Sequence, residues 1–218
     1  DTPSAQRRAA GDDQRSSAAH ITEQRFQKAS MPRISRPATR TGDDGTTATA
    51  NGKRVAKDSP QIRTFGAIDE LNSVIGVALS QKTLSPELIE PLHAVQNDLF
   101  HLGAELNRLE PSEDALAQPR IEDRHIRVLD QLITELYDEL GPLQNFTLPG
   151  GAPTAASLHL ARAVCRRAES EAAVLASSAK VRTLALQYLN RLSDALFLMA
   201  RAENRRTSTA EPLWHTHR

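Results

Sequence analysis

The sequence predicts an all-α fold, a five-helix up-and-down bundle, and three observations support this prediction. Apolar residues recur at a spacing of three to four over long segments, which is the period of an amphipathic helix. No segment of useful length alternates between apolar and polar residues as a half-buried strand does. Aromatic residues are only 4% of the 218 residues, so the core must consist mainly of Leu, Ala, Val and Ile, which suits packed helices. Mostly short joints then favour antiparallel neighbours in one bundle.

The first two helices are expected over residues 60–81 and 86–108. The apolar period of the first is carried by Ile62, Phe65, Ile68, Leu71, Ile75 and Leu79. The apolar period of the second is carried by Leu88, Leu92, Val95, Leu99 and Leu102. Ser85 is a favourable N-cap residue, and Pro86 suits the first helical position because an N–H group has no partner there.

Three further helices are expected over residues 120–140, 153–177 and 180–206. The apolar period of the first of these is carried by Ile121, Ile126, Leu129, Leu132, Ile133 and Leu136. Residues 110–119 contain two prolines and several acids, which indicates a loop before it. Gly141 and Pro142 end that helix, and the segment 146–151 reads as a non-helical connector.

The chain is expected to have three parts. Residues 1–35 are rich in Ala, Arg, Gln and Ser, and they cannot bury enough apolar surface to offset the entropy of ordering. We therefore expect a disordered N-terminal extension; its Arg and Ser content resembles a transit peptide, but its acidic residues argue against one. The helical domain with its N-terminal loop is expected over 36–206, and 207–218 is expected to be a flexible tail.

Composition excludes several classes of protein. Lys and Arg number 27, as do Asp and Glu, and a chain of zero net charge is not a general binder of nucleic acid or acidic membranes. No apolar run approaches the roughly 20 residues that span a bilayer. Cys165 is the only cysteine, which excludes an intramolecular disulfide and a thiolate zinc cage. A reducing compartment follows, with cytoplasm as the first expectation and the mitochondrial matrix as the second.

The segment Thr39–Thr47 is the richest in groups that bind polar ligands. Its two glycines permit positive φ, which lets successive N–H groups converge on an anion. Its threonine hydroxyls add donors, and its carboxylates can hold Mg²⁺. A nucleoside triphosphate with its metal fits this chemistry, although the segment is neither a Walker loop nor GxGxxG. A surface turn rich in turn-forming residues is an equally open interpretation.

The last two helices carry polar side chains on faces that a bundle would normally bury. Arg162, Arg166 and Glu169 share one helix face by their spacing, and the next helix has a comparable face. That second face consists of Asn190, Asp194, Phe197 and Arg201. Two arginines one turn apart repel each other unless an anion or carboxylates lie between them, and the planar guanidinium suits phosphate. A solvated face with ion pairs is the alternative, but the segment Thr39–Thr47 favours a shared phosphate site.

Two Glu-x-x-His motifs, at residues 90–93 and 122–125, leave a metal site open as another interpretation. Two such motifs form a di-iron site when one glutamate from each of two other helices joins them, and Glu70 and Glu105 are the candidates. Pro91 lies inside the first motif and argues against this site, because it would disturb the helix that must aim both ligands.

Six short motifs follow one another between residues 37 and 205. They occupy Thr39–Thr47, Arg54–Asp58, Gly66–Ser73, Phe146–Gly151, Arg162–Glu169 and Tyr188–Asp194. In their order and spacing they resemble the PduO-type ATP:corrinoid adenosyltransferases. Each motif is weak alone, but the six together are highly specific.

The resemblance implies a five-helix subunit with a ferritin-like, cobalamin adenosyltransferase-like bundle. It implies a homotrimer with ATP and the corrinoid at subunit interfaces. The implied reaction transfers the 5′-deoxyadenosyl group of ATP to cob(I)alamin, with Mg²⁺, and forms adenosylcobalamin and triphosphate. Cobalt(I) is the nucleophile, so the protein has to align C5′ with cobalt and stabilise the departing triphosphate. A corrinoid reductase and an adenosylcobalamin-dependent enzyme are the implied partners.

The resemblance also implies roles for individual residues. The implied ATP contacts are Thr39, Arg40, Thr41, Gly42, Asp43, Gly45, Thr47, Lys57, Arg166, Glu169 and Asn190. Asp69 and Arg162 would form an ion pair across the subunit interface, on the corrinoid side. Phe146 would lie against the lower corrin face and displace the axial base, and Arg166 and Asp194 would complete the catalytic set, with Asp194 also on the corrinoid side.

Two alternatives stay open beside this resemblance. From the sequence alone, Phe146 is also compatible with an ordinary core aromatic. A non-catalytic corrinoid carrier or nucleotide sensor on the same bundle would keep the same binding residues.

Overall fold

The structure, a computed structural model, describes residues 40–109 and 118–215 of the chain. The chain divides into two units, Asp1–Thr41 and Gly42–Arg218. Of the first unit only Arg40 and Thr41 are described, and Arg40 has a left-handed backbone with φ of 58°. The expected N-terminal extension, Thr39 and most of the expected loop at 110–119 lie outside the described residues. The helices and strands of the described residues all belong to the second unit.

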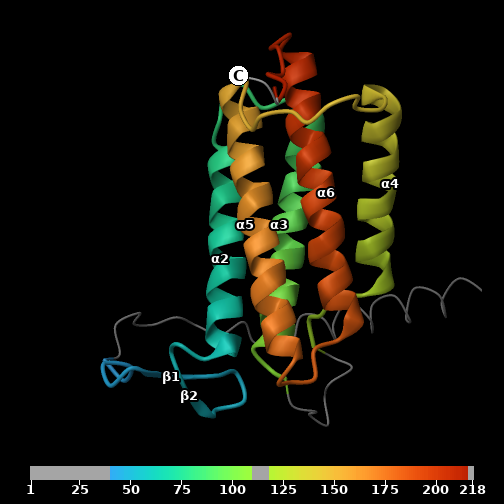
Figure 1. Cartoon of the computed structure of the whole chain (residues 1–218). Helices are drawn as coiled ribbons and strands as arrows, with labels where there is room; N and C mark the ends of the chain where they lie inside the picture. The colour runs from blue at the N-terminus through green and yellow to red at the C-terminus, as the bar shows by residue number, and fades with distance from the viewer. Residues whose placement is uncertain (1–39, 110–117, 216–218) are drawn as a thin grey trace, which may run out of the picture. The chain divides into compact units, whose positions relative to one another are not determined.

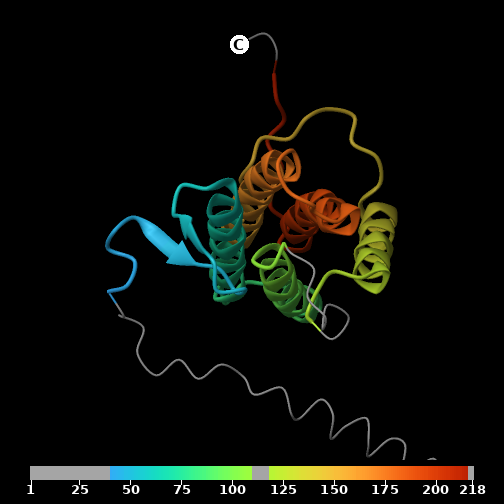
Figure 2. The same cartoon turned by 90° about the horizontal axis from the view of Figure 1, so that it is seen from below.

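The predicted bundle of five helices is confirmed. The helices are α2 (Pro60–Leu79), α3 (Pro86–Leu106), α4 (Asp123–Leu140), α5 (Pro153–Ala176) and α6 (Thr183–Arg206). They run alternately in opposite directions (Figure 1). α5 packs against both α2 and α6, α3 packs against α2, and α4 packs against α6 (Figure 2).

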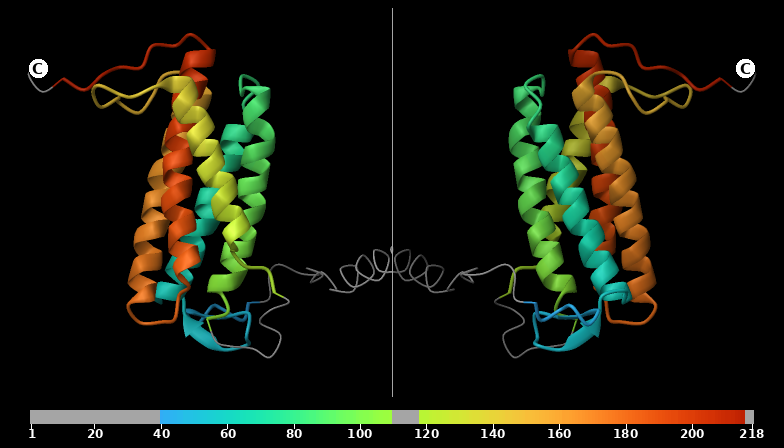
Figure 3. Two further views of the ribbon diagram at one scale, coloured as in Figure 1. Left: turned by 90° about the vertical axis from the view of Figure 1, so that its right-hand side faces the viewer. Right: turned by 90° about the vertical axis from the view of Figure 1, so that its left-hand side faces the viewer.

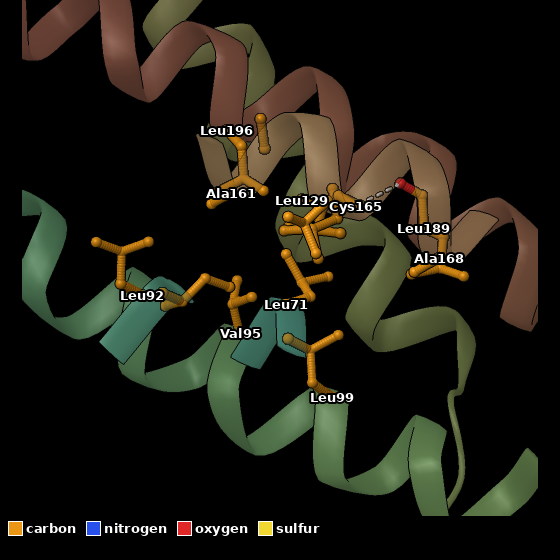
Figure 4. Close-up of a cluster of buried hydrophobic side chains, with 14 of the residues drawn as sticks. Leu71, Leu92, Val95, Leu99, Leu129, Ala161, Cys165, Ala168, Leu189 and Leu196 are labelled. Carbon is orange, nitrogen blue, oxygen red and sulfur yellow. Dashed lines mark hydrogen bonds between the residues drawn. The ribbon is translucent and has the colours of Figure 1, made fainter. Parts of the chain in front are cut away.

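Leucine, alanine and valine side chains form the core between these helices, as the low aromatic content predicts. Figure 4 shows Leu71, Leu92 and Leu99 facing side chains of α4, α5 and α6 across the bundle. α5 contributes mostly small residues, which allow the neighbouring helix axes to come close. Those small residues are Ala161, Cys165, Ala168 and Ala172, all of them fully buried. Burial of apolar area at about 25 cal/mol per Å² is the main force that holds the helices together.

The helix ends depart from the predictions in detail. Ser85 precedes α3 as expected, but its side chain makes no capping bond, and its backbone N–H instead donates to Glu203 Oε1 at 3.2 Å. α4 begins three residues later than predicted because Ile121 is held outside the helix. Its N–H donates to Glu105 Oε2 at 2.9 Å, and its carbonyl accepts from Arg182 at 2.9 Å.

A small β-hairpin precedes the bundle and was not predicted. Its strands are β1 (Thr46–Ala48) and β2 (Arg54–Ala56), which pair antiparallel with Thr47 opposite Val55. Strands of three residues are too short to display a period of two in the sequence. The turn of the hairpin is bonded to the bundle, because Ala50 N–H donates to Asn107 Oδ1 at 3.3 Å. The hairpin therefore lies at the end of the bundle where α2 begins (Figure 3).

The connector between α4 and α5 lies at the opposite end of the bundle (Figure 3). Its residues Phe146–Leu148 pair with the segment after α6. Leu148 N–H donates to the Pro212 carbonyl and Trp214 N–H to the Phe146 carbonyl, both at 2.8 Å. A flexible tail is expected from residue 207 onward, whereas Pro212–Trp214 are hydrogen-bonded to this connector. None of the helices in the described residues has the length and apolar character needed to cross a membrane.

Candidate active site

The loop at Gly42–Thr47 is shaped by its own hydrogen bonds. Asp44 Oδ1 accepts from the Thr46 N–H at 2.9 Å and from the Thr46 hydroxyl at 2.8 Å, and Arg54 pairs with the same carboxylate at 3.1 Å. The two bonds from Thr46, with a smaller contribution from Arg54, hold the pKa of Asp44 below its ordinary value. Gly45 has φ of 80°, which turns the chain into β1. Asp44 thus maintains the loop and has little capacity left for a ligand.

Lys57 lies beside the backbone of this loop. A methyl group added at Gly42 would lie 3.2 Å from Lys57 Nζ and 3.0 Å from the Thr46 carbonyl oxygen, so Gly42 provides the space for this approach. Lys57, Asp43 and Gly45 are exposed, and Thr47 is half-buried. The loop therefore offers the ammonium group of Lys57 and the hydroxyl of Thr47 for an anion, whereas the N–H groups of Gly45 and Thr46 already donate to Gly42 and Asp44.

The polar faces of α5 and α6 meet as their spacing predicts. Asn190 donates to Glu169 Oε1 at 3.2 Å and accepts from Arg191 at 3.0 Å. Arg191 also pairs with Asp130 of α4 at 2.9 Å, so three helices share one network. Arg166 and Asp194 are exposed on the two helices of this face. The network fixes Glu169 and Asn190, and Arg166, three residues before Glu169 on α5, has an exposed guanidinium that an anion can reach.

Phe146 is 74% exposed, so the interpretation of it as an ordinary core aromatic is wrong. Its ring lies edge-on to Trp214, with 6.1 Å between the ring centroids. Next to it is a pocket of about 460 Å³, called the Phe146 pocket below. The pocket is lined by Leu143, Gln144, Asn145, Phe146, Thr147, Pro149, His159, Arg162 and Phe197. Its lining combines apolar side chains with amide, hydroxyl, imidazole and guanidinium groups, which suits a largely apolar ligand with polar substituents.

Arg162 lies in the Phe146 pocket and not beside Asp69. Its guanidinium carbon is 5.3 Å from the centroid of the Phe197 ring, a cation–π geometry. Asp69 instead lines a second pocket of about 430 Å³, together with residues of α2 and α3 such as Phe65 and Phe100. Within this one chain the two side chains therefore face different pockets.

The loop at Gly42–Thr47 and the connector that carries Phe146 lie at opposite ends of the bundle (Figure 1). α5 alone has 24 residues, which at 1.5 Å per residue is about 36 Å of helix between the two ends. Arg40 and Thr41 belong to the first unit, and Thr39 lies outside the described residues. One chain therefore does not bring all the predicted site residues together.

The di-iron interpretation is wrong, because its proposed ligands do not converge. Glu90 and His93 are exposed on α3. Glu70 pairs with Arg167, and Glu105 is bonded to Ile121 and Arg182. Among the described residues, the groups that could hold a metal together are Asp98, His101 and His125.

The Asp98–His101–His125 cluster has hydrogen bonds that join helices and not those of a metal site. Asp98, His125 and Tyr188, which make these contacts, are called the clamp below. His125 Nδ1 accepts from the Glu122 N–H at 2.8 Å, so in the neutral ring the proton is on Nε2, which lies 3.6 Å from Asp98. A metal-bound histidine normally donates from its second nitrogen. Asp98 also accepts from the Tyr188 hydroxyl at 3.1 Å, and burial is the main reason that its pKa is raised. The clamp joins α3, α4 and α6.

Cys165 is buried without a disulfide partner and donates to the Leu189 carbonyl at 3.3 Å, and burial raises the pKa of its thiol above the ordinary value. Because only a thiolate attacks readily, Cys165 has no capacity to act as a nucleophile.

Three residues near these sites were not singled out from the sequence: Asp44, His159 and Trp214. Asp44 has an Asx-type signal, since its carboxylate binds the N–H two residues later. His159 lies three residues before Arg162 on the same helix face, which the helical period could have indicated. Trp214 carries no local signal, because its position depends on pairing with a connector far away in the chain.

Comparison with known proteins identifies the family. The family model "Cobalamin adenosyltransferase" matches residues 37–203. A cobalamin adenosyltransferase from Cupriavidus metallidurans is 41% identical over 186 residues, which are 85% of this chain and 97% of the relative. A corrinoid adenosyltransferase from Citrobacter freundii is 44% identical over 165 residues, which are 76% of this chain and 93% of the relative.

Solved structures agree with the sequence relatives. A variant of a PduO-type ATP:corrinoid adenosyltransferase from Lactobacillus reuteri, complexed with cobalamin and ATP, superposes with a TM-score of 0.77. It is 28% identical, and the match covers 83% of this chain and 97% of that one. Fold, motif order and relatives lead to one conclusion: this chain belongs to the family of PduO-type cobalamin adenosyltransferases.

Proposed function

We propose that this protein transfers the 5′-deoxyadenosyl group of ATP to cob(I)alamin and releases triphosphate. The observation that carries the proposal is that one chain contains a candidate site for each of the two substrates, ATP and the corrinoid. One is an anion-binding loop with Lys57, and the other is a pocket with an exposed Phe146 and a half-buried Arg162. Relatives at 41% and 44% identity bear the names cobalamin and corrinoid adenosyltransferase, which supports the same reaction.

The chemistry needs no nucleophile from the protein. The electron pair of cobalt(I) attacks C5′ of the ribose, a Co–C bond forms, and the bond from C5′ to the triphosphate oxygen breaks with its electrons leaving on triphosphate. The protein contributes alignment of the two substrates and positive charge for the leaving group. Lys57 and Arg166 are the cations that fit this role, because both are exposed beside polar groups of the proposed nucleotide site.

ATP contacts are divided between two regions in this proposal. The loop residues Gly42, Asp43, Gly45 and Thr47 bind the phosphates together with Lys57, while the roles of Thr39, Arg40 and Thr41 as ATP contacts rest on the sequence resemblance alone. Glu169 and Asn190, fixed by their mutual hydrogen bond, bind the nucleoside next to Arg166. Mg²⁺ would arrive with the phosphates, and Asp43 is the loop carboxylate suited to it because Asp44 is engaged by Thr46 and Arg54.

Phe146 acts on the corrinoid in this proposal. An exposed ring held by a paired connector can lie against the lower corrin face and exclude the axial base. Loss of that ligand makes cobalt(II) easier to reduce, since the axial donor no longer raises the energy of the orbital that accepts the electron. Asp194 would shape the same site from α6.

We also propose a homotrimer, and the same geometry supports sites that are shared between subunits. Asp69 and Arg162 face different pockets of one chain, and the loop and the connector that carries Phe146 lie at opposite ends. Neighbouring subunits would bring these residues together in this proposal. Asp69 of one subunit would pair with Arg162 of the next, and the loop of one would lie beside the Phe146 pocket of the other. We place this trimer in the cytoplasm, with a corrinoid reductase and an adenosylcobalamin-dependent enzyme as partners.

The test is a time course of the cob(I)alamin spectrum under anaerobic conditions with ATP and Mg²⁺. The proposal predicts repeated turnover to adenosylcobalamin, whereas a carrier or sensor would bind both ligands and leave the cob(I)alamin spectrum unconverted. Phe146→Ala should keep ATP binding but lose most of the activity that starts from cob(II)alamin. Unchanged activity of that variant from cob(II)alamin would dismiss the role of Phe146.

A further inference from the structure

His159 is a buried polar side chain that nothing above assigns to a role. It lies on α5, is 5% exposed and lines the Phe146 pocket. The centroid of its ring is 6.0 Å from the centroid of the Phe197 ring. The guanidinium of Arg162 also lies over the Phe197 ring. His159 thus belongs to the wall of the proposed corrinoid pocket.

Neither ring nitrogen of His159 has a hydrogen-bond partner among the described residues. A neutral imidazole carries one N–H donor and one acceptor, and leaving both without partners and without water is unfavourable. Thr147 Oγ1 in the same pocket also lacks a partner among these residues, whereas the buried side-chain amide of Asn204 is satisfied. Asn204 binds the Ala152 N–H at 2.9 Å and the Gly150 carbonyl at 3.1 Å.

The surroundings of His159 select its uncharged form. Burial is the main cause that lowers its pKa, the neighbouring Arg162 adds to this, and Glu211 opposes it. Glu211 is itself paired with Arg201 at 3.3 Å, so it is shared with a second cation. At neutral pH the ring therefore offers a donor and an acceptor but no charge.

We propose that His159 is a corrinoid-binding residue whose neutral imidazole hydrogen-bonds a carboxamide at the edge of the corrin ring. A primary carboxamide has both a donor and an acceptor and no charge, so it can pair with one of the two orphan nitrogens whether that nitrogen carries the proton or not. Phosphate and carboxylate groups would instead favour Arg162, the cation of the same pocket. This assignment rests on the proposed function, and it adds a residue that recognises the substrate.

The test compares His159→Phe and His159→Gln in the full-length protein, with His93→Phe as control because His93 is an exposed histidine on α3. The substrates are cob(I)alamin and cob(I)inamide, which keeps the corrin carboxamides but lacks the lower nucleotide. For His159→Phe we expect the KM for both corrinoids to rise about tenfold, the effect of one lost hydrogen bond, with the KM for ATP unchanged. His159→Gln, which keeps a donor and an acceptor, should stay within about threefold of the wild type.

The melting temperature separates binding from a structural role. Phenylalanine removes two unsatisfied nitrogens and keeps the ring volume, so His159→Phe should melt at or above the wild-type temperature. A clearly lower melting temperature would make His159 a structural residue and overturn the proposal. So would a rise in KM confined to cob(I)alamin, since the partner would then be in the lower nucleotide, or an unchanged KM for both. Inactive wild-type protein would instead overturn the proposed function.

Discussion

At the scale of single residues, Gly151 has a backbone that no other residue would adopt without strain. Its φ is 99°, and a methyl group built on it would lie 2.1 Å from Asn204 Oδ1. Asn204 in turn fixes the start of α5 by bonding Ala152 and Gly150. The end of the connector that carries Phe146 therefore depends on this glycine.

Gly151→Ala should lower the free energy of unfolding by about 1–3 kcal/mol, because the side chain forces a strained φ and displaces Asn204. Urea unfolding measures this value. Gly66→Ala is the matched control, since a methyl group there meets nothing within 4 Å and the position lies inside α2. The control should be stabilised by up to about 1 kcal/mol through helix propensity. Equal stability of the two variants would contradict the strain at Gly151.

The lowered pKa of His159 predicts how the free energy of unfolding depends on pH. The pKa of the ring in the folded protein lies below the ordinary value of 6.5, so between the two values the unfolded chain binds more protons. The free energy of unfolding must then rise with pH through this window, and the contribution is lost as pH falls through it. Arg162 and Glu211 are the charged groups that influence the ring, and Phe197 of α6 adds no charge.

Urea unfolding of the wild type and His159→Phe at pH 5.5 and 7.5 measures this dependence. The wild type should lose more stability on acidification than the variant, because the variant lacks the group that must be protonated. Parallel losses in the two proteins would show that His159 does not contribute.

At the scale of secondary structure, the clamp of Asp98, His125 and Tyr188 joins α3 to α4 and α6, neither of which packs closely against α3. Tyr188→Phe removes the hydroxyl that donates to Asp98 and leaves a half-buried carboxylate with one donor fewer. We expect a loss of about 1–3 kcal/mol in the free energy of unfolding. Tyr137→Phe is the control, since Tyr137 is 50% exposed on α4, and it should change stability by less than about 0.5 kcal/mol. A similar loss in both variants would mean that the clamp adds nothing.

Helices were predictable from the sequence, and short pairings were not. The apolar period located the five helices of the described residues, because in each helix apolar residues recur on the face that becomes buried. Leu71 of α2, Leu99 of α3 and Leu129 of α4 are examples. It missed the hairpin at Thr46–Ala56, whose strands of three residues show no period. It also missed the pairing of Phe146–Leu148 with Pro212–Trp214, since backbone bonds between distant segments leave no local pattern. The start of α4 was placed too early because Ile121 is apolar yet held outside the helix.

The candidate site was predictable in part. The faces of α5 and α6 were found by spacing, and the hydrogen bond between Asn190 and Glu169 follows from it. The exposure of Phe146 could not be derived from periodicity, because the connector has none. The separation of Asp69 from Arg162 depends on which groove each helix face lines, which a single sequence does not specify.

At the scale of the whole molecule, the proposed trimer predicts complementation between two inactive variants. Asp69→Asn and Arg162→Ala should each lose most activity, because each leaves one charge of the proposed interface pair without its partner. If the pair joins neighbouring subunits, trimers assembled from a mixture contain some interfaces with both native residues. Refolding an equal mixture should then restore about a quarter of the wild-type activity, the random fraction of intact interfaces. A mixture as inactive as its components, with trimers present by native mass spectrometry, would contradict the shared site.

The central claim is that C5′ of ATP is transferred to cobalt and that triphosphate leaves intact. The most direct measurement follows ATP labelled in the adenine and in the γ-phosphate during turnover with cob(I)alamin. The account predicts that the adenine label appears in the corrinoid and that the phosphate label appears in triphosphate, in equal amounts. Label released as ADP and phosphate, or adenine that never joins the corrinoid, would contradict it.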